Sequence, residues 1–233
     1  MPRWRFDILH PIDLVEEIAI GHGYEDLSYD VPKATLTAIP RIDGQIRRRV
    51  REALQGLGLI QIQSLTLSND KDQFELMRWK PDGKATRMTN PITTEHTILR
   101  QNILPGLLRL LAANRHHDLP QGVYELGTVV IDHKNRDRFA FLVAEKSGGF
   151  ASLRGRIQGL MRDLGCNEWS LEPIDNGPWL SGRSAAIVVD GVTIGECGEI
   201  DPHVSLSFDL NVPLSGAQID MIALSSVVQD PVH

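Results

Sequence analysis

Apolar residues recur at helical spacing in four stretches of the chain. The clearest is the leucine stripe of residues 104–111, which repeats at i, i+3, i+4 and i+7 and predicts an amphipathic helix beginning near Pro105. Residues 43–57 and 150–164 carry similar stripes, and a glycine follows each of them as a stop signal. A shorter stripe at residues 14–19 predicts a fourth helix, with Asp13 as its N-cap. Each apolar face is expected to pack on another element.

Apolar runs without helical spacing predict the strands. Residues 123–130 indicate a buried strand that carries one acidic residue, Glu125, and a short charged loop leads from it into a second apolar run. Asp190-Gly191 between two apolar runs predicts a β-hairpin. The predicted strands are residues 3–9, 59–67, 123–130, 139–144, 169–173, the two arms of 183–200, and 214–219, and residues 68–84 are expected to form a polar surface excursion. The pattern predicts an α+β fold, an antiparallel β-sheet flanked by helices that pack mainly on one face.

Composition limits the class of protein. With 233 residues, of which 42% are hydrophobic, the chain can bury a full core. It contains no apolar run long enough to span a bilayer and no apolar signal region at its N-terminus, so we expect a cytoplasmic protein. Cys166 and Cys197 lack the spacing of a disulfide framework or a zinc site. A net charge of −6 gives no overall attraction for nucleic acid, so any RNA contact must be local.

Four carboxylates lie within eleven residues near the N-terminus: Asp7, Asp13, Glu16 and Glu17. Oxygen ligands of this kind suit a hard cation such as Mg²⁺, which binds one or two carboxylates and keeps several waters. The spacing alone favours a simpler interpretation, because acidic residues in the first turn of a helix stabilise the positive end of its dipole without any metal. On the residues alone, both interpretations stay open.

Two other polar features need an explanation. Glu125 lies in an apolar strand, and a buried carboxylate must be paired or hydrogen-bonded, so either Arg183 or Arg100 is its expected partner. His116 and His117 are followed by an aspartate in a polar loop, but no third ligand lies at a telling spacing, which argues against a metal there.

Three phrases of the sequence resemble one family. They are RFDILHPIDLVEEIAIGHGYE, LRQNILPGLL and SGRSAAIVVDGVTIGECGEIDPHV, and in this order they resemble the beta subunit of phenylalanyl-tRNA synthetase in its archaeal and eukaryotic form. The likeness extends over residues 5–219. It implies that Asp7, Asp13, Glu16 and Glu17 bind a magnesium ion shared with the alpha subunit, and that the remainder resembles a class II synthetase core that has lost catalysis.

The resemblance also defines what an active enzyme would need. Active class II synthetases carry an arginine two residues before the glutamate of their second motif and another arginine in a glycine-rich third motif. Val123 occupies the first of these places, and no helix with the second arginine follows the C-terminal GECGEI. The resemblance therefore implies a subunit that is non-catalytic by itself, with no catalytic or cofactor-binding residues of its own.

The family implies partners as well. It implies pairing with the catalytic alpha subunit, through which alone ATP would be bound, and a heterotetramer of two alpha and two beta chains that holds tRNA(Phe). The helix and strand of residues 43–67 resemble the first class II motif, which builds subunit interfaces. We expect residues 1–30 to be the C-terminal part of a preceding metal-site domain and residues 31–233 to be the synthetase-like core.

The length departs from the family, whose beta subunits carry further N-terminal domains, so the chain is either part of a longer protein or a shorter paralogue. As a free-standing paralogue it could act as an amino-acid or nucleotide-binding regulatory module. A third possibility is an active enzyme in which Arg100 or Arg183 replaces the missing arginines.

Overall fold

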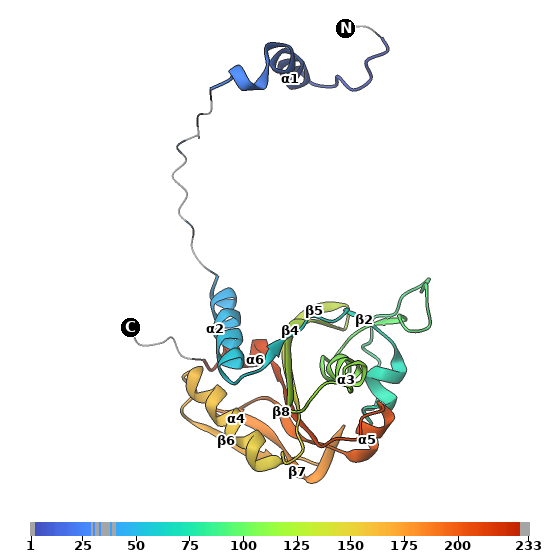
Figure 1. Cartoon of the computed structure of the whole chain (residues 1–233), viewed down its shortest axis with the longest axis vertical. Helices are drawn as coiled ribbons and strands as arrows, with labels where there is room; N and C mark the ends of the chain where they lie inside the picture. Colours follow the sequence, from blue (N-terminus) through green and yellow to red (C-terminus); the bar gives the residue numbers. More distant parts are fainter. Residues whose placement is uncertain (1–2, 29, 31–32, 34–37, 39–40, 229–233) are drawn as a thin grey trace. The chain divides into compact units, whose positions relative to one another are not determined.

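The computed structural model describes residues 3–28, 30, 33, 38 and 41–228. By its internal contacts the chain divides into two units, Met1–Ile39 and Pro40–His233, which are described separately below (Figure 1). None of the helices in the described part of the chain is long and apolar enough to cross a membrane.

The first unit contains the helix α1, Pro11–His22, and one turn of 3₁₀ helix, Tyr24–Asp26. The N-cap is His10 and not Asp13, because Pro11 suits the first helical position and so starts the helix earlier than predicted. Asp13 is the third helical residue, where it completes a capping box. The predicted strand at residues 3–9 does not form among the described residues. The apolar face of α1 buries no residue within this unit, and Ile18 is 70% exposed there.

The second unit is built on a seven-stranded sheet with the order β1-β4-β5-β9-β8-β7-β6. Every neighbouring pair is antiparallel except β1 and β4, which are parallel, so the predicted antiparallel sheet is confirmed with one parallel strand added at its edge. The strands in chain order are β1 (Ile60–Gln61), β4 (Gln121–Ile131), β5 (Lys134–Ala144), β6 (Trp169–Pro173), β7 (Trp179–Val189), β8 (Val192–Ile200) and β9 (Leu214–Asp220). A separate two-stranded sheet pairs β2 (Leu67–Ser68) with β3 (Ile98–Leu99).

Helices cover both faces of the large sheet, so the expectation of helices mainly on one face is wrong. On one face lie α2 (Ile42–Gly56), α4 (Phe150–Asp163) and α6 (Met221–Ser225), and on the other lie α3 (Leu104–Ala113) and α5 (Pro202–Ser207), as Figure 1 shows. The physical reason lies in β5, where successive residues Leu142 and Val143 belong to the two opposite apolar clusters. A continuous apolar strand must be covered on both sides.

The predicted helices and the Asp190-Gly191 hairpin all form, but two other predictions fail in part. The run of residues 59–67 gives only β1 and the first residue of β2, because the chain leaves the large sheet between them. The stretch 68–84 is not wholly a surface excursion, since it contains a π-helix, Lys71–Glu75, and buries Phe74 and Met77.

Candidate functional site

The four N-terminal carboxylates do not converge on one point. Asp7 and Glu17 both contact the guanidinium of Arg5, and Arg5 Nη2 lies 2.6 Å from Asp7 Oδ2. Asp13 Oδ2 accepts hydrogen bonds from the backbone N–H groups of Leu9 and His10, each at 2.7 Å. The structure therefore brings two of the four predicted ligands together around an arginine and uses a third as a helix cap.

The Glu16 side chain is exposed and makes no hydrogen bond or ion pair within the described part of the chain. Among the described residues no group of three or more histidine, cysteine or acidic side chains is arranged to hold a metal. The chemistry of the donor set still fits Mg²⁺, because all four candidates are carboxylates. The hydrogen bonds from Arg5 also lower the pKa of Asp7, which keeps that carboxylate ionised.

The buried acid of β4 has the partner that the sequence left open. Arg100 Nη1 lies 2.7 Å from Glu125 Oε1, an ion pair without a well-aligned hydrogen bond, and the two side chains are 5% and 1% exposed. Ser64 joins them, since its hydroxyl donates to Glu125 Oε2 at 2.6 Å and accepts from Arg100 Nη1 at 2.8 Å. The other candidate partner, Arg183, pairs with Glu199 at 3.0 Å.

The absence of a side chain at Gly127 leaves the space that the Arg100 guanidinium occupies. A Cβ atom built on this glycine would collide with Arg100 Nη2, so a side chain here would force the buried guanidinium to shift from the position in which its Nε donates to the Thr128 carbonyl oxygen at 3.0 Å. In the YELG segment, Glu125 is thus one member of a buried ion pair and Gly127 leaves room for the other member, Arg100. The Arg100 guanidinium is thus held by Glu125, by Ser64 and by the Thr128 carbonyl oxygen.

Val123, two residues before Glu125, is an apolar residue in apolar surroundings. Val123 is 7% exposed and belongs to the apolar cluster under α3, together with Leu142 and Ala144. An arginine here would be buried among hydrocarbon groups. His116 and His117 lie against each other, with ring centroids 4.3 Å apart, and belong to no metal-binding group among the described residues.

A polar groove of about 530 Å³ opens on the face of the sheet that carries α3. Its floor includes Arg138 of β5, Glu196 of β8 and Gln218 of β9. Burial raises the pKa of the Glu196 carboxyl and lowers the pKa of the Arg138 guanidinium. Sequence reasoning missed this groove, although the polar residues at alternate positions of apolar strands were the available signal.

Much of the polar lining is occupied with holding the fold. Gln218 Oε1 accepts from the Ile103 backbone at 2.9 Å, and Arg138 Nη1 donates to Asn102 Oδ1 at 2.7 Å. These bonds tie the start of α3 to the sheet. Among the acids of the groove, Asp220 lies 3.8 Å from Arg138, whereas Asp82 and Glu196 have no charged partner within ion-pair distance among the described residues.

Comparison with known proteins adds an independent finding. The family model described as the phenylalanyl-tRNA synthetase beta chain CLM domain matches residues 28–221, and the tRNA synthetase B5 domain model matches residues 1–24. A phenylalanine–tRNA ligase beta subunit of Archaeoglobus fulgidus is 38% identical over 225 residues, which are 96% of this chain and 41% of that protein. The corresponding subunit of Methanothrix thermoacetophila is 34% identical, over 95% of this chain and 41% of that protein.

Solved structures support the fold alone. A pyrrolysyl-tRNA synthetase of Desulfitobacterium hafniense superposes with a TM-score of 0.65 at 13% identity, over 80% of this chain and 72% of that one.

The present chain spans about two fifths of the length of the curated relatives it matches. Because the CLM-domain model covers far more than half of the sequence, the chain belongs to the phenylalanyl-tRNA synthetase beta chain family.

Proposed function

We propose that this chain is the non-catalytic core of a phenylalanine–tRNA ligase beta subunit and pairs with the catalytic alpha subunit. The observation that carries the proposal is Val123, an apolar and buried residue where an active class II synthetase needs an arginine. When an amino acid is activated with ATP, the charge that develops on the pentavalent phosphorus of the transition state must be met by fixed cations. Membership of the beta chain family supports the same assignment.

In this proposal the alpha subunit holds ATP and phenylalanine, and two alpha and two beta chains form a heterotetramer that binds tRNA(Phe) in the cytoplasm. Residues 1–30 belong to a metal-site domain, and residues 31–233 form the core. The two matched family models, with bounds near residues 24 and 28, support this division.

We further propose that Asp7, Asp13, Glu16 and Glu17 hold a magnesium ion shared with the alpha subunit. The ion would supply the positive charge that joins these carboxylates to ligands on the partner. Arg5 now neutralises Asp7 and Glu17, so it would compete with the ion for both of them. Glu16, which has no partner among the described residues, is the ligand most ready to engage.

Co-expression with the alpha subunit tests the pairing. We expect one complex by size exclusion with light scattering, and no pyrophosphate exchange by the chain alone with phenylalanine and ATP. Glu16→Gln should weaken the complex only when Mg²⁺ is present. The substitution removes a proposed ligand of the metal, and it breaks no side-chain contact within the described part of this chain. Glu25→Ala, which changes an exposed acid of the same unit, is the control. A stable chain that never binds the alpha subunit would refute the proposal.

The polar groove favours a second candidate, a regulatory module that binds an amino acid or a nucleotide. Arg138 and Glu196 offer opposite charges in one groove, which suits a zwitterion. Thermal shift with amino acids and nucleotides, on the chain without its partner, separates the two proposals. A ligand that raises the melting temperature, together with failure to bind the alpha subunit, would favour this candidate.

A further inference from the structure

With its acids ionised, the polar groove on the α3 side of the sheet carries an excess of one negative charge. Its ionisable lining residues are Lys80 and Arg138 against Asp82, Glu196 and Asp220. Asp220 lies 3.8 Å from Arg138 and offsets its charge. A second cavity, of about 400 Å³ where β8 ends and β9 begins, offers no free acid, since both acids in its wall are paired with arginines. The groove therefore favours a ligand that brings positive charge.

Glu196, on β8, is the acid of the groove that lacks a hydrogen-bond donor within the described part of the chain. Burial raises the pKa of its carboxyl, and the nearby Trp179 indole N–H, which lowers that pKa, is not aligned to form a hydrogen bond. Asp82 and Asp220 differ, because each accepts a hydrogen bond from a backbone N–H group at 2.9 Å. The Glu196 side chain is partly exposed, so a ligand in the groove can reach its carboxylate.

A buried amide supplies a second acceptor without a partner. Gln101 is 4% exposed, and its Nε2 donates to Asp82 Oδ1 at 3.3 Å, so Oε1 is the end that is left over. Oε1 accepts no hydrogen bond among the described residues, yet it is not enclosed by protein atoms, so a ligand in the groove can reach it. Native proteins rarely leave a polar group of a buried side chain without a partner. Two accessible acceptors in one groove favour a ligand rich in N–H donors.

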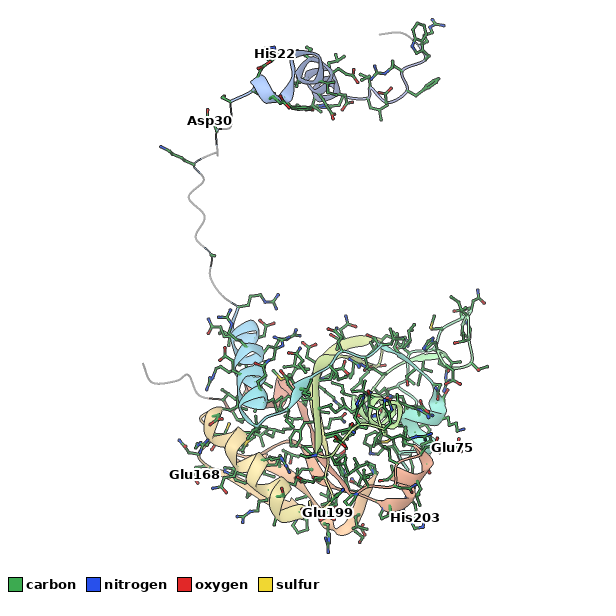
Figure 2. All side chains as sticks on the ribbon, in the orientation of Figure 1. His22, Asp30, Glu75, Glu168, Glu199 and His203 are labelled. Atoms are coloured by element: carbon green, nitrogen blue, oxygen red, sulfur yellow. The ribbon has the colours of Figure 1, made fainter. Side chains whose placement is uncertain are left out.

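An aromatic side chain forms one wall of the groove. Trp79 lines it just beyond the π-helix, whose last residue, Glu75, is labelled in Figure 2, and the labelled Glu199 lies on β8, the strand that carries Glu196. The Trp79 indole packs against Gly177, where a Cβ atom would collide with its Nε1. Aromatic faces attract cations, and a planar cation can stack on them.

We propose that the groove binds a small guanidinium compound. The planar guanidinium donates two parallel hydrogen bonds to the Glu196 carboxylate and a further one to Gln101 Oε1, and it stacks on Trp79. Its charge balances the excess of the groove, and its five N–H donors match the two unpartnered acceptors. The inference rests on the second candidate function, because it names the ligand class of the same groove. It does not depend on the alpha subunit or on the metal.

Three amino acids that differ at the end of the side chain test the proposal by isothermal titration calorimetry on the full chain. L-Arginine should bind. L-Citrulline, whose urea group has the same shape without the charge, should bind about tenfold more weakly or less. L-Lysine, which carries the charge without the planar N–H edge, should also bind about tenfold more weakly or less. Equal affinity for the three amino acids, or no binding of arginine, would overturn the proposal.

The same titrations separate this inference from the function on which it rests. If arginine does not bind but a nucleotide or another amino acid raises the melting temperature, the guanidinium assignment is wrong and the second candidate function stands. If no amino acid or nucleotide binds, both are wrong.

Two substitutions of glutamate by glutamine give a matched comparison. Glu196→Gln should weaken arginine about tenfold or more and remove its advantage over citrulline, because the lost charge is the one that the guanidinium contacts. It should not lower the melting temperature, since it breaks no hydrogen bond within the described part of the chain. Glu172→Gln, at an exposed position of β6 outside the groove, should leave the affinity unchanged. Unchanged binding of arginine by Glu196→Gln overturns the proposal.

Variants of the aromatic wall test the stacking. Trp79→Phe should keep most of the affinity for arginine, because an aromatic face remains, whereas Trp79→Leu should weaken arginine about threefold or more. Circular dichroism checks that each variant is folded, and the comparison of Glu196→Gln with Glu172→Gln decides alone if Trp79→Leu is not. Arginine binding by a folded Trp79→Leu variant at the wild-type affinity would contradict the proposed position of the guanidinium.

Discussion

The ion pair between Arg100 and Glu125 provides the sharpest prediction about stability. Both side chains are almost fully buried, and Ser64 bridges them. Removing one member of such a pair leaves the other charge without compensation in a medium of low polarity, which costs about 3–5 kcal/mol. We therefore expect Arg100→Met, and separately Glu125→Leu, each to lower the free energy of unfolding by about 3–5 kcal/mol.

The double variant, Arg100→Met with Glu125→Leu, tests whether the single variants lose stability because one buried charge is left unpaired or because the site tolerates no change of side chain. Replacing both charges by apolar groups is often close to neutral, apart from about 1 kcal/mol for each hydrogen bond lost by Ser64 and the Thr128 carbonyl. The double variant should thus be more stable than either single variant. Urea unfolding followed by far-ultraviolet circular dichroism measures all three free energies on one scale.

The exposed pair of Arg87 with Asp70 is the control, because its side chains are 61% and 43% exposed. Arg87→Met should cost less than about 1 kcal/mol. If the double variant instead loses the sum of the two single effects, the charges do not compensate each other and the reasoning about burial is wrong. A cost of Arg100→Met as small as that of Arg87→Met would refute it equally.

Three further predictions follow from individual residues. Leu107→Ala, in the fully buried stripe of α3, should lower the free energy of unfolding by about 2–5 kcal/mol, whereas Ile92→Ala at a 97% exposed position should change it by less than about 0.5 kcal/mol. Urea unfolding of both measures the contrast, and equal effects would contradict the assignment of the core. Burial raises the pKa of Cys197 to about 12, so its thiol should not react with an aromatic disulfide reagent at pH 8 until urea unfolds the chain. Reaction of this thiol in the folded protein, at the rate of an exposed thiol, would refute its burial. Arg156 lowers the pKa of Glu145, so the pair stabilises the fold above the ordinary pKa of 4.5 and loses this effect as the pH falls through the lower folded value. The difference in urea midpoint between the wild type and Arg156→Gln should therefore be present at pH 7 and shrink at pH 3, and a constant difference would contradict the pairing.

The fold was largely predictable where local pattern and tertiary packing agree. The leucine stripe of α3 predicts both the helix and the face that it buries, and Asp190-Gly191 predicts the turn between β7 and β8. The pattern was misleading where a short apolar run leaves one sheet for another, as between β1 and β2. It was also misleading at residues 68–84, which include the π-helix. Phe74 and Met77 are buried there, but most of their neighbours in sequence are polar, so the segment was predicted to lie on the surface.

The candidate sites were predictable to different degrees. A buried carboxylate in an apolar strand must have a partner, so the sequence identified the problem at Glu125, but only the structure selects Arg100 over Arg183. The carboxylates near the N-terminus were visible as a cluster, whereas the contacts of Arg5 with two of them depend on geometry that spacing does not encode. The two cavities combine residues from strands far apart in sequence, and no local pattern reports such a combination.

The packing around Val123 and Arg100 limits what either position can do. An arginine at Val123 would lie in the apolar cluster beneath α3, next to Leu142, with its charge unpaired. Arg100, which follows β3 and pairs with Glu125 of β4, is already neutralised there and held by the Thr128 carbonyl. To place a fixed cation at position 123 and to free Arg100, an apolar cluster would have to open and a buried ion pair would have to separate. Each step alone costs several kcal/mol, which is a large part of the stability of a typical domain of about 5–15 kcal/mol, so no single substitution is expected to achieve both.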